Sequence, residues 1–155
     1  MGYYITLEDS TLVIPADRLD EAYAALCALN NHNTIKGGCR GDWRNNTHDN
    51  GPDERVWFSW MEWNYPEVHS STEEILTALG FDVGINNDGS LCLYGYDNKI
   101  GDEAHFLDAL APFAISGTDE EPQVVWRGED GAVWRQVVID GRMVSQAGRL
   151  VFDPA

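Results

Sequence analysis

Three short apolar runs separated by two tight turns form the clearest hydrophobic pattern, and they lie at the end of the chain. The runs cover residues 124–126, 133–139 and 143–152, and their Val, Ile and Trp content is typical of β-strands. The second turn is Asp140-Gly141, which favours a two-residue hairpin because both turn positions need a positive φ. The sequence therefore predicts an antiparallel three-stranded meander over residues 122–152.

Two segments have the spacing of helices that bury one face. Residues 18–30 repeat apolar side chains at helical spacing, and Asp17 is expected to cap this helix. Residues 71–79 begin with a capping box in which Ser71 is the cap and Glu74 lies three positions later. Both segments are therefore expected to fold as helices.

Residues 103–113 form a third helical segment, and Pro112 is expected to weaken its last turn because proline lacks a backbone N–H. The most aromatic segment, residues 56–63, is apolar on both faces, which predicts a central strand. Shorter strand-like runs lie at residues 3–7, 12–14, 82–85 and 91–96.

Strands that occur mostly in hairpins, with helices between them, are typical of the α+β class. The sequence predicts an antiparallel β-sheet of about 7–8 strands, including the C-terminal three-stranded meander, with three helices packed mainly on one face. A chain of 155 residues with 43% apolar residues can bury such a core in a single domain over residues 1–155.

An irregular loop at about residues 31–54 interrupts this order, and a segment of that length without helix or strand indicates a functional or mobile loop. It is the least acidic region, and its candidate binding residues are Arg40, Trp43 and Arg44. A basic, aromatic loop in an acidic protein favours one hypothesis, a small-ligand protein that binds or sequesters a nucleotide-type molecule.

The net charge is strongly negative, because 26 acidic residues face ten basic ones and the sum is −16. Such a charge repels phosphates, so direct binding to nucleic acid and to acidic membranes is not expected. Two interpretations stay open: the charge serves only solubility, or it forms an acidic surface for a basic partner. The candidate contacts are Asp119, Glu120 and Glu121 in an acidic loop and Glu129 and Asp130 in the first meander turn.

The sequence contains no recognisable catalytic motif. The four histidines lack metal-ligand spacing, and neither a GxSxG elbow nor a phosphate-binding glycine loop occurs. A folded loop that gathers His32, His48 and Cys39 around a metal ranks last among the hypotheses. We therefore expect no catalytic residues, no metal and no cofactor. The absence of a signal peptide and of a membrane-length apolar run predicts a cytoplasmic protein with reduced cysteines.

Three segments carry a resemblance to a known group of proteins: LTALGFDV at residues 76–83, GYDNKIGDEAHFLDALAP at 95–112 and VWRGEDGAVWRQVVIDGRMV at 125–144. They resemble a family of small uncharacterised proteins from phages and actinobacteria, over roughly residues 56–152. The resemblance implies the same order of elements and a phage-linked origin. It transfers no catalytic residue.

The leading hypothesis is a non-enzymatic acidic interaction protein, encoded by a phage, that binds and modulates a host or defence protein through its acidic surface. The alternative is the small-ligand protein that uses the loop at residues 31–55 and its tryptophans. Partner identity and oligomeric state lie beyond the sequence.

Overall fold

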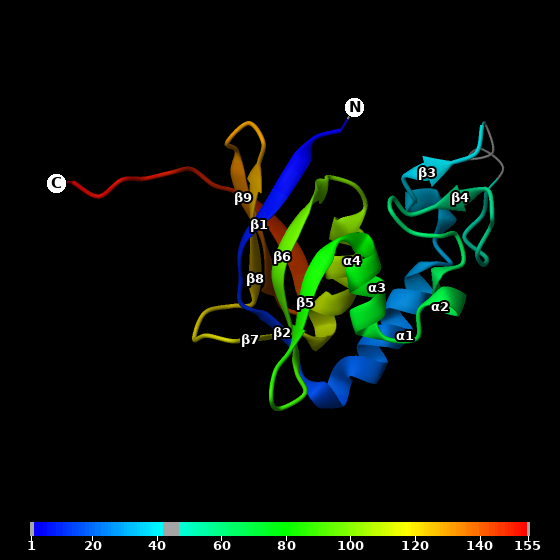
Figure 1. The fold of residues 1–155 in the computed structure, drawn as a ribbon, viewed down its shortest axis with the longest axis horizontal. Helices are drawn as coiled ribbons and strands as arrows, with labels where there is room; N and C mark the ends of the chain where they lie inside the picture. The colour runs from blue at the N-terminus through cyan, green and yellow to red at the C-terminus, as the bar shows by residue number, and fades with distance from the viewer. Residues whose placement is uncertain (1, 42–46, 155) are drawn as a thin grey trace.

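The computed structural model describes residues 2–41 and 47–154, and it confirms the α+β class. A large antiparallel sheet has the strand order β10-β9-β8-β1-β6-β2-β7, and β5 pairs with β6 beside this path. Helices α1, α3 and α4 lie together on one side of this sheet (Figure 1). The strands are β1 (Tyr4–Ser10), β2 (Leu12–Ile14), β5 (Phe81–Ile85), β6 (Leu91–Lys99), β7 (Ile115–Ser116), β8 (Gln123–Gly128), β9 (Val133–Ile139) and β10 (Arg142–Ala147).

The predicted helices form at the predicted places, with α1 at Leu19–Leu29, α3 at Thr72–Leu79 and α4 at Glu103–Leu110. The capping box is confirmed, because the Ser71 hydroxyl accepts a hydrogen bond from the Glu74 N–H at 3.1 Å. Asp17 is not the cap that the sequence predicts. It lies in the 3-10 turn Ala16–Arg18, and Arg18 precedes the first residue of α1.

The last turn predicted for α4 is a 3-10 turn, Ala111–Phe113, which agrees with the expected effect of Pro112. A fourth, short helix that the sequence did not predict, α2, covers Tyr65–Val68. The Tyr65 hydroxyl donates to the Leu26 carbonyl at 2.6 Å, so α2 is anchored to α1.

The core lies between the sheet and the helices, and Trp126 of β8 is its largest buried side chain. The Trp126 ring meets Tyr96 edge-on, with centroids 5.3 Å apart, and Phe81 packs beside both. The indole N–H donates to the Gln136 side-chain oxygen at 2.8 Å, so burial leaves no unpaired donor there.

The prediction of a central strand over residues 56–63 is wrong. Only β4 (Val56–Trp57) forms, and it pairs with β3 (Gly38–Cys39) in a separate two-stranded sheet. The backbone N–H of Ser59 donates at 2.8 Å to the Asp102 carboxylate. The Asp102 side chain therefore binds the N–H that a neighbouring strand would otherwise pair with. Phe58 packs edge-on against Phe106, which explains why the segment is apolar without being a central strand.

The loop prediction for residues 31–54 also needs correction. The 3-10 turn Asn33–Ile35 and strand β3 lie inside it, so part of the segment is ordered structure. The two strands of the small sheet and α2 lie beside the helices, at a distance from the meander (Figure 1).

The meander forms as predicted up to residue 147, with Asp140 and Gly141 at φ values of 52° and 75°. The strand predicted to continue to residue 152 ends at Ala147 instead. Gly148 donates the last ladder hydrogen bond, at 2.9 Å, to the carbonyl of Val133, where β9 begins. Since no neighbouring strand continues past that point, residues 148–154 leave the sheet (Figure 1).

Candidate functional site

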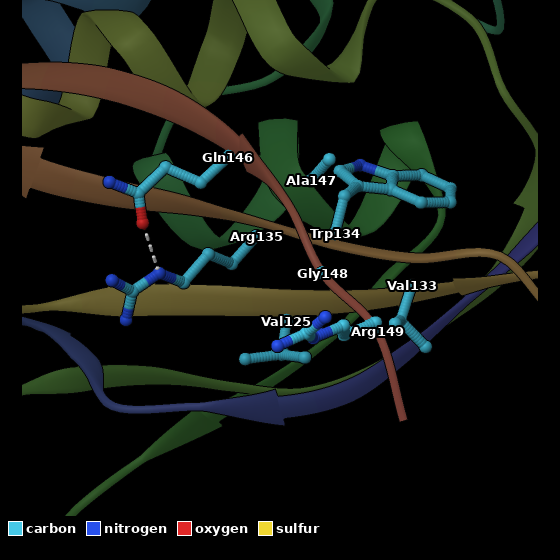
Figure 2. A pocket seen from close by; sticks show the side chains of 8 residues that line it. All are labelled: Val125, Val133, Trp134, Arg135, Gln146, Ala147, Gly148 and Arg149. Atoms are coloured by element: carbon cyan, nitrogen blue, oxygen red, sulfur yellow. Dashed lines mark hydrogen bonds between the residues drawn. The ribbon is translucent and has the colours of Figure 1, made fainter. Parts of the chain in front are cut away.

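The meander carries a pocket that we call the meander pocket, with a volume of about 380 Å³. It lies where β10 ends and the chain leaves the sheet, so the strands form its floor and the departing chain forms one wall (Figure 2). Its lining combines two arginines, a glutamine and apolar side chains. The lining residues are Val125, Val133, Trp134, Arg135, Gln146, Ala147, Gly148 and Arg149.

Arg135 of β9 is the best-positioned polar side chain of the meander pocket. Its Nε donates to the Gln146 side-chain oxygen at 2.7 Å, the contact drawn in Figure 2, and its Nη1 donates to the Gln123 side-chain oxygen at 2.7 Å. Both acceptors are neutral amides, so they hold the guanidinium in place and leave its positive charge uncompensated. The arrangement follows from the register, because Gln146 lies directly opposite Arg135 in the β9–β10 pair.

Four of the ten basic residues belong to the meander and its exit, namely Arg127, Arg135, Arg142 and Arg149. Arg127 pairs with Glu8 at 2.6 Å. Among the residues that the structure describes, the other three form no ion pair with a carboxylate. The lining of the meander pocket therefore includes two arginines and no acidic residue, in a protein whose net charge is −16.

Sequence reasoning missed this pocket, although one signal was available. Alternation along the predicted strands places every second side chain on the same face. Once the registers are known, Val125, Arg135 and Gln146 fall in one row across the three strands. The registers themselves, and the wall formed by residues 148 and 149, require the structure.

The acidic loop predicted as a contact lies between β7 and β8, and Asp119, Glu120 and Glu121 are all exposed. Its shape comes from short-range hydrogen bonds, since Thr118 N–H donates to the Ser116 hydroxyl at 3.1 Å. In the described parts of the chain, none of the three carboxylates forms an ion pair. Their negative charges therefore face solvent.

Glu129 and Asp130 have partners within the protein. The Glu129 carboxylate accepts from the Tyr4 N–H at 3.1 Å, and the Asp130 carboxylate accepts from the Tyr3 hydroxyl and from the Ala132 N–H. The bond with Tyr3 lowers the pKa of Asp130. These contacts fasten the β8–β9 turn to the first strand, which is a structural role.

The two acidic groups do not form one surface patch, because the six-residue strand β8 separates them. At about 3.3 Å per residue, that strand spans roughly 20 Å. The acidic loop therefore stands alone as the predicted docking region, and the β8–β9 turn lies at the opposite end of the strand.

Arg40 is exposed beside β3, and its N–H donates to the Arg55 carbonyl at 2.8 Å. Trp43 and Arg44 lie outside the described residues. The nucleotide-type site proposed for this loop therefore stays a prediction. His32 lies 4.0 Å from Asp49, and the described residues contain no group of three His, Cys, Asp or Glu arranged for a metal ion.

Lys36, which the sequence places in a polar loop, is fully buried. Its ammonium group donates to the Asn30 carbonyl at 2.8 Å and to the Asn33 side-chain oxygen at 2.7 Å, and it lies 5.5 Å from the centre of the Phe58 ring. Burial lowers its pKa to about 8, although the charges of Asp53 and Asp49 act in the opposite direction. No carboxylate touches this buried cation among the described residues.

Fold and pocket together define an α+β protein whose C-terminal meander presents a pocket lined by two arginines. A search of protein-family models, curated proteins and solved structures finds no match to this chain. The resemblance to small phage and actinobacterial proteins therefore stays a prediction. No helix in residues 2–41 and 47–154 has the length and apolar character needed to cross a membrane.

Proposed function

We propose that this protein is a non-enzymatic binding protein that docks onto another protein, a host or defence protein with a basic surface. The observation that carries the proposal is the exposed apolar segment Leu150, Val151 and Phe152, which we call the apolar tail segment. Its three side chains are 59%, 74% and 86% exposed. Consecutive apolar side chains in water are typical of a segment that becomes buried against a partner.

The apolar tail segment follows an edge strand, which adds to the support. β10 pairs only with β9 in the described sheet, so its other side presents backbone groups without a strand partner, apart from the Met143 N–H, which donates to the Asp108 carboxylate at 3.4 Å. Exposed edge strands of this kind accept strands from other chains. A partner that covers β10 therefore also reaches the apolar tail segment.

The free energy from burying this apolar segment is not by itself sufficient for stable binding. Full burial of three such side chains contributes roughly 5–9 kcal/mol, whereas association costs about 4–15 kcal/mol in lost freedom. The unpaired acidic loop at residues 119–121 supplies a second contribution, because its charge accelerates encounter with a basic surface. The proposal therefore assigns anchoring to the apolar tail segment and attraction to the acidic loop.

The test is affinity capture from the lysate of the natural host with three forms of the tagged protein. In the first variant, Val151 and Phe152 are replaced by serine. In its control, Ile85→Ser removes another exposed apolar side chain, at the end of β5. The proposal predicts a protein that the wild type and the control retain and that the tail variant loses.

A second pair of variants separates the electrostatic part. Reversal of Asp119, Glu120 and Glu121 to lysine is compared with the same reversal at Glu54, Glu67 and Asp97, which are exposed elsewhere. Loss of the partner in the first triple variant alone supports docking through the acidic loop. Equal capture by all variants would refute the proposed surface.

A further inference from the structure

We propose that the meander pocket binds a small organic anion, a carboxylate or phosphate ester with an apolar group. The anionic group sits between Arg135 and Arg149, and the apolar group lies against Val125 and Val133. This site differs from the protein-docking surface proposed above in its ligand and in its residues, although it adjoins the apolar tail segment.

The Arg135 guanidinium is fixed in position and still has free hydrogen-bond donors. Two glutamine side-chain oxygens hold it at 2.7 Å each, one from β8 and one from β10. Only two of its five N–H groups are used by these bonds, so donors remain for a ligand. A rigid, charged fork with free donors is the arrangement that recognises carboxylate and phosphate groups.

Neither arginine of the pocket has a counter-ion among the described residues. The chain has 26 acidic residues, yet none of those described lies within ion-pair distance of Arg135 or Arg149. Glu8, on the neighbouring strand β1, is already paired with Arg127. Asp9, opposite Val125 in the same register, forms no ion pair with either arginine of the pocket.

Arg149 supplies the second cation from the departing chain. The Gly148 N–H donates to the Val133 carbonyl, and a Cβ at position 148 would lie 3.3 Å from the Val133 side chain. Glycine therefore lets the chain cross close to the sheet, and the next residue is Arg149. In Figure 2 the Arg149 side chain lies beside Val125 and Val133, on the pocket side of the departing chain.

The size and lining of the pocket fit a small molecule that has both an anionic and an apolar part. Its volume of about 380 Å³ falls in the range of ligand sites, about 300–1,000 Å³. Val125 and Val133 give it an apolar surface beside Arg149 (Figure 2). Polar groups are few and concentrated at Arg135, Gln146 and Arg149, as expected for a site in which they orient the ligand.

A ligand at this position bridges the sheet and the departing chain. It contacts Arg135 within β9 and Arg149 just before the apolar tail segment, so binding restrains residues 148–152. The direction of the exposed Leu150, Val151 and Phe152 therefore depends on whether the pocket is filled.

The test is an NMR titration of the full chain with three probes that share a phenyl ring. Phenyl phosphate and 3-phenylpropionate carry the two anionic groups, and 3-phenylpropan-1-ol is the neutral counterpart. We expect shifts of the Gly148 amide and the Arg135 Nε–H signals with at least one anion and weaker binding of the alcohol. Binding of one anion alone supports the site and identifies the preferred group.

Two matched variants locate the binding. Arg149→Gln removes a pocket cation that makes no hydrogen bond or ion pair with the described residues. This change is expected to lower the affinity for the anion by about tenfold to a hundredfold. Arg142→Gln removes the same charge from the start of β10, outside the pocket, and serves as the control. Three results would overturn the proposal: no shift with either anion, equal binding of the alcohol, or the same loss of affinity in both variants.

Discussion

Lys36→Met is expected to remove a pH dependence of stability that the buried ammonium group imposes on the protein. Burial lowers the pKa of Lys36 from 10.5 to about 8 in the folded chain, and unfolding restores the higher value. The unfolded chain therefore binds more protons between those two pH values. Because of this difference, the free energy of unfolding of the wild type rises with pH across that window.

The size of the effect follows from the same two pKa values. The full difference corresponds to about 3 kcal/mol, which destabilises the wild type below pH 8 and is relieved above pH 10.5. Between about pH 7.5 and about pH 9.5 the expected gain is about 2 kcal/mol. Loss of the hydrogen bonds to Asn30 and Asn33 changes the free energy of unfolding of the variant by an amount that does not depend on pH.

The assay is urea unfolding followed by tryptophan fluorescence at those two pH values. The chain has two lysines, so Lys99→Met is the natural control. Tyrosines that titrate in the same range are common to all three proteins, and their effect cancels in the differences. On raising the pH, wild type and Lys99→Met should each gain about 2 kcal/mol relative to Lys36→Met. A gain of the same size in Lys36→Met would refute the assignment.

Three further predictions concern the fold. Trp126→Ala should lower the free energy of unfolding by about 3–5 kcal/mol, measured by urea unfolding, because it empties the core and leaves the Gln136 side chain without its donor. Ser71→Ala should cost about 1 kcal/mol through loss of the α3 cap, whereas Thr77→Ala, exposed in the same helix, should change the melting temperature little. Asp102→Ala should speed hydrogen exchange at the Gly37 and Ser59 amides, which donate to its carboxylate at 2.8 Å, and unchanged exchange would contradict that anchoring role.

The elements that the sequence predicts correctly are those whose signals are local. The Ser71 cap, the Asp140-Gly141 turn and the 3.6-residue spacing of α1 depend on neighbours within a few positions. Each of these features is the same in almost any tertiary context, so the pattern alone is sufficient.

The errors come from partners that are distant in the sequence. Residues 56–63 look like a strand, but Asp102, more than 40 positions away, binds the Ser59 N–H and leaves only two residues of β4. The last strand ends at Ala147 because β9 begins at Val133, which no local pattern around Leu150 reveals. Lys36 is buried because Asn30, Asn33 and Phe58 surround it, although its neighbours in sequence are polar.

The sequence locates the acidic loop but not the meander pocket, and the role of that loop stays a prediction. The acidic loop was found from composition, since a run of three acidic residues between strands is visible in the sequence. The structural use of Glu129 and Asp130 was missed because Tyr3 and Tyr4, their partners, lie at the other end of the chain. The meander pocket was missed because it requires both the strand registers and the path of residues 148 and 149.

The most direct test of the proposed docking function is affinity capture of the wild-type protein from host lysate at low and at high salt, read by mass spectrometry. The account predicts one basic protein retained at low salt and much reduced at high salt, because screening weakens the attraction of the acidic loop. A capture that is empty at both salt concentrations would contradict the proposed function.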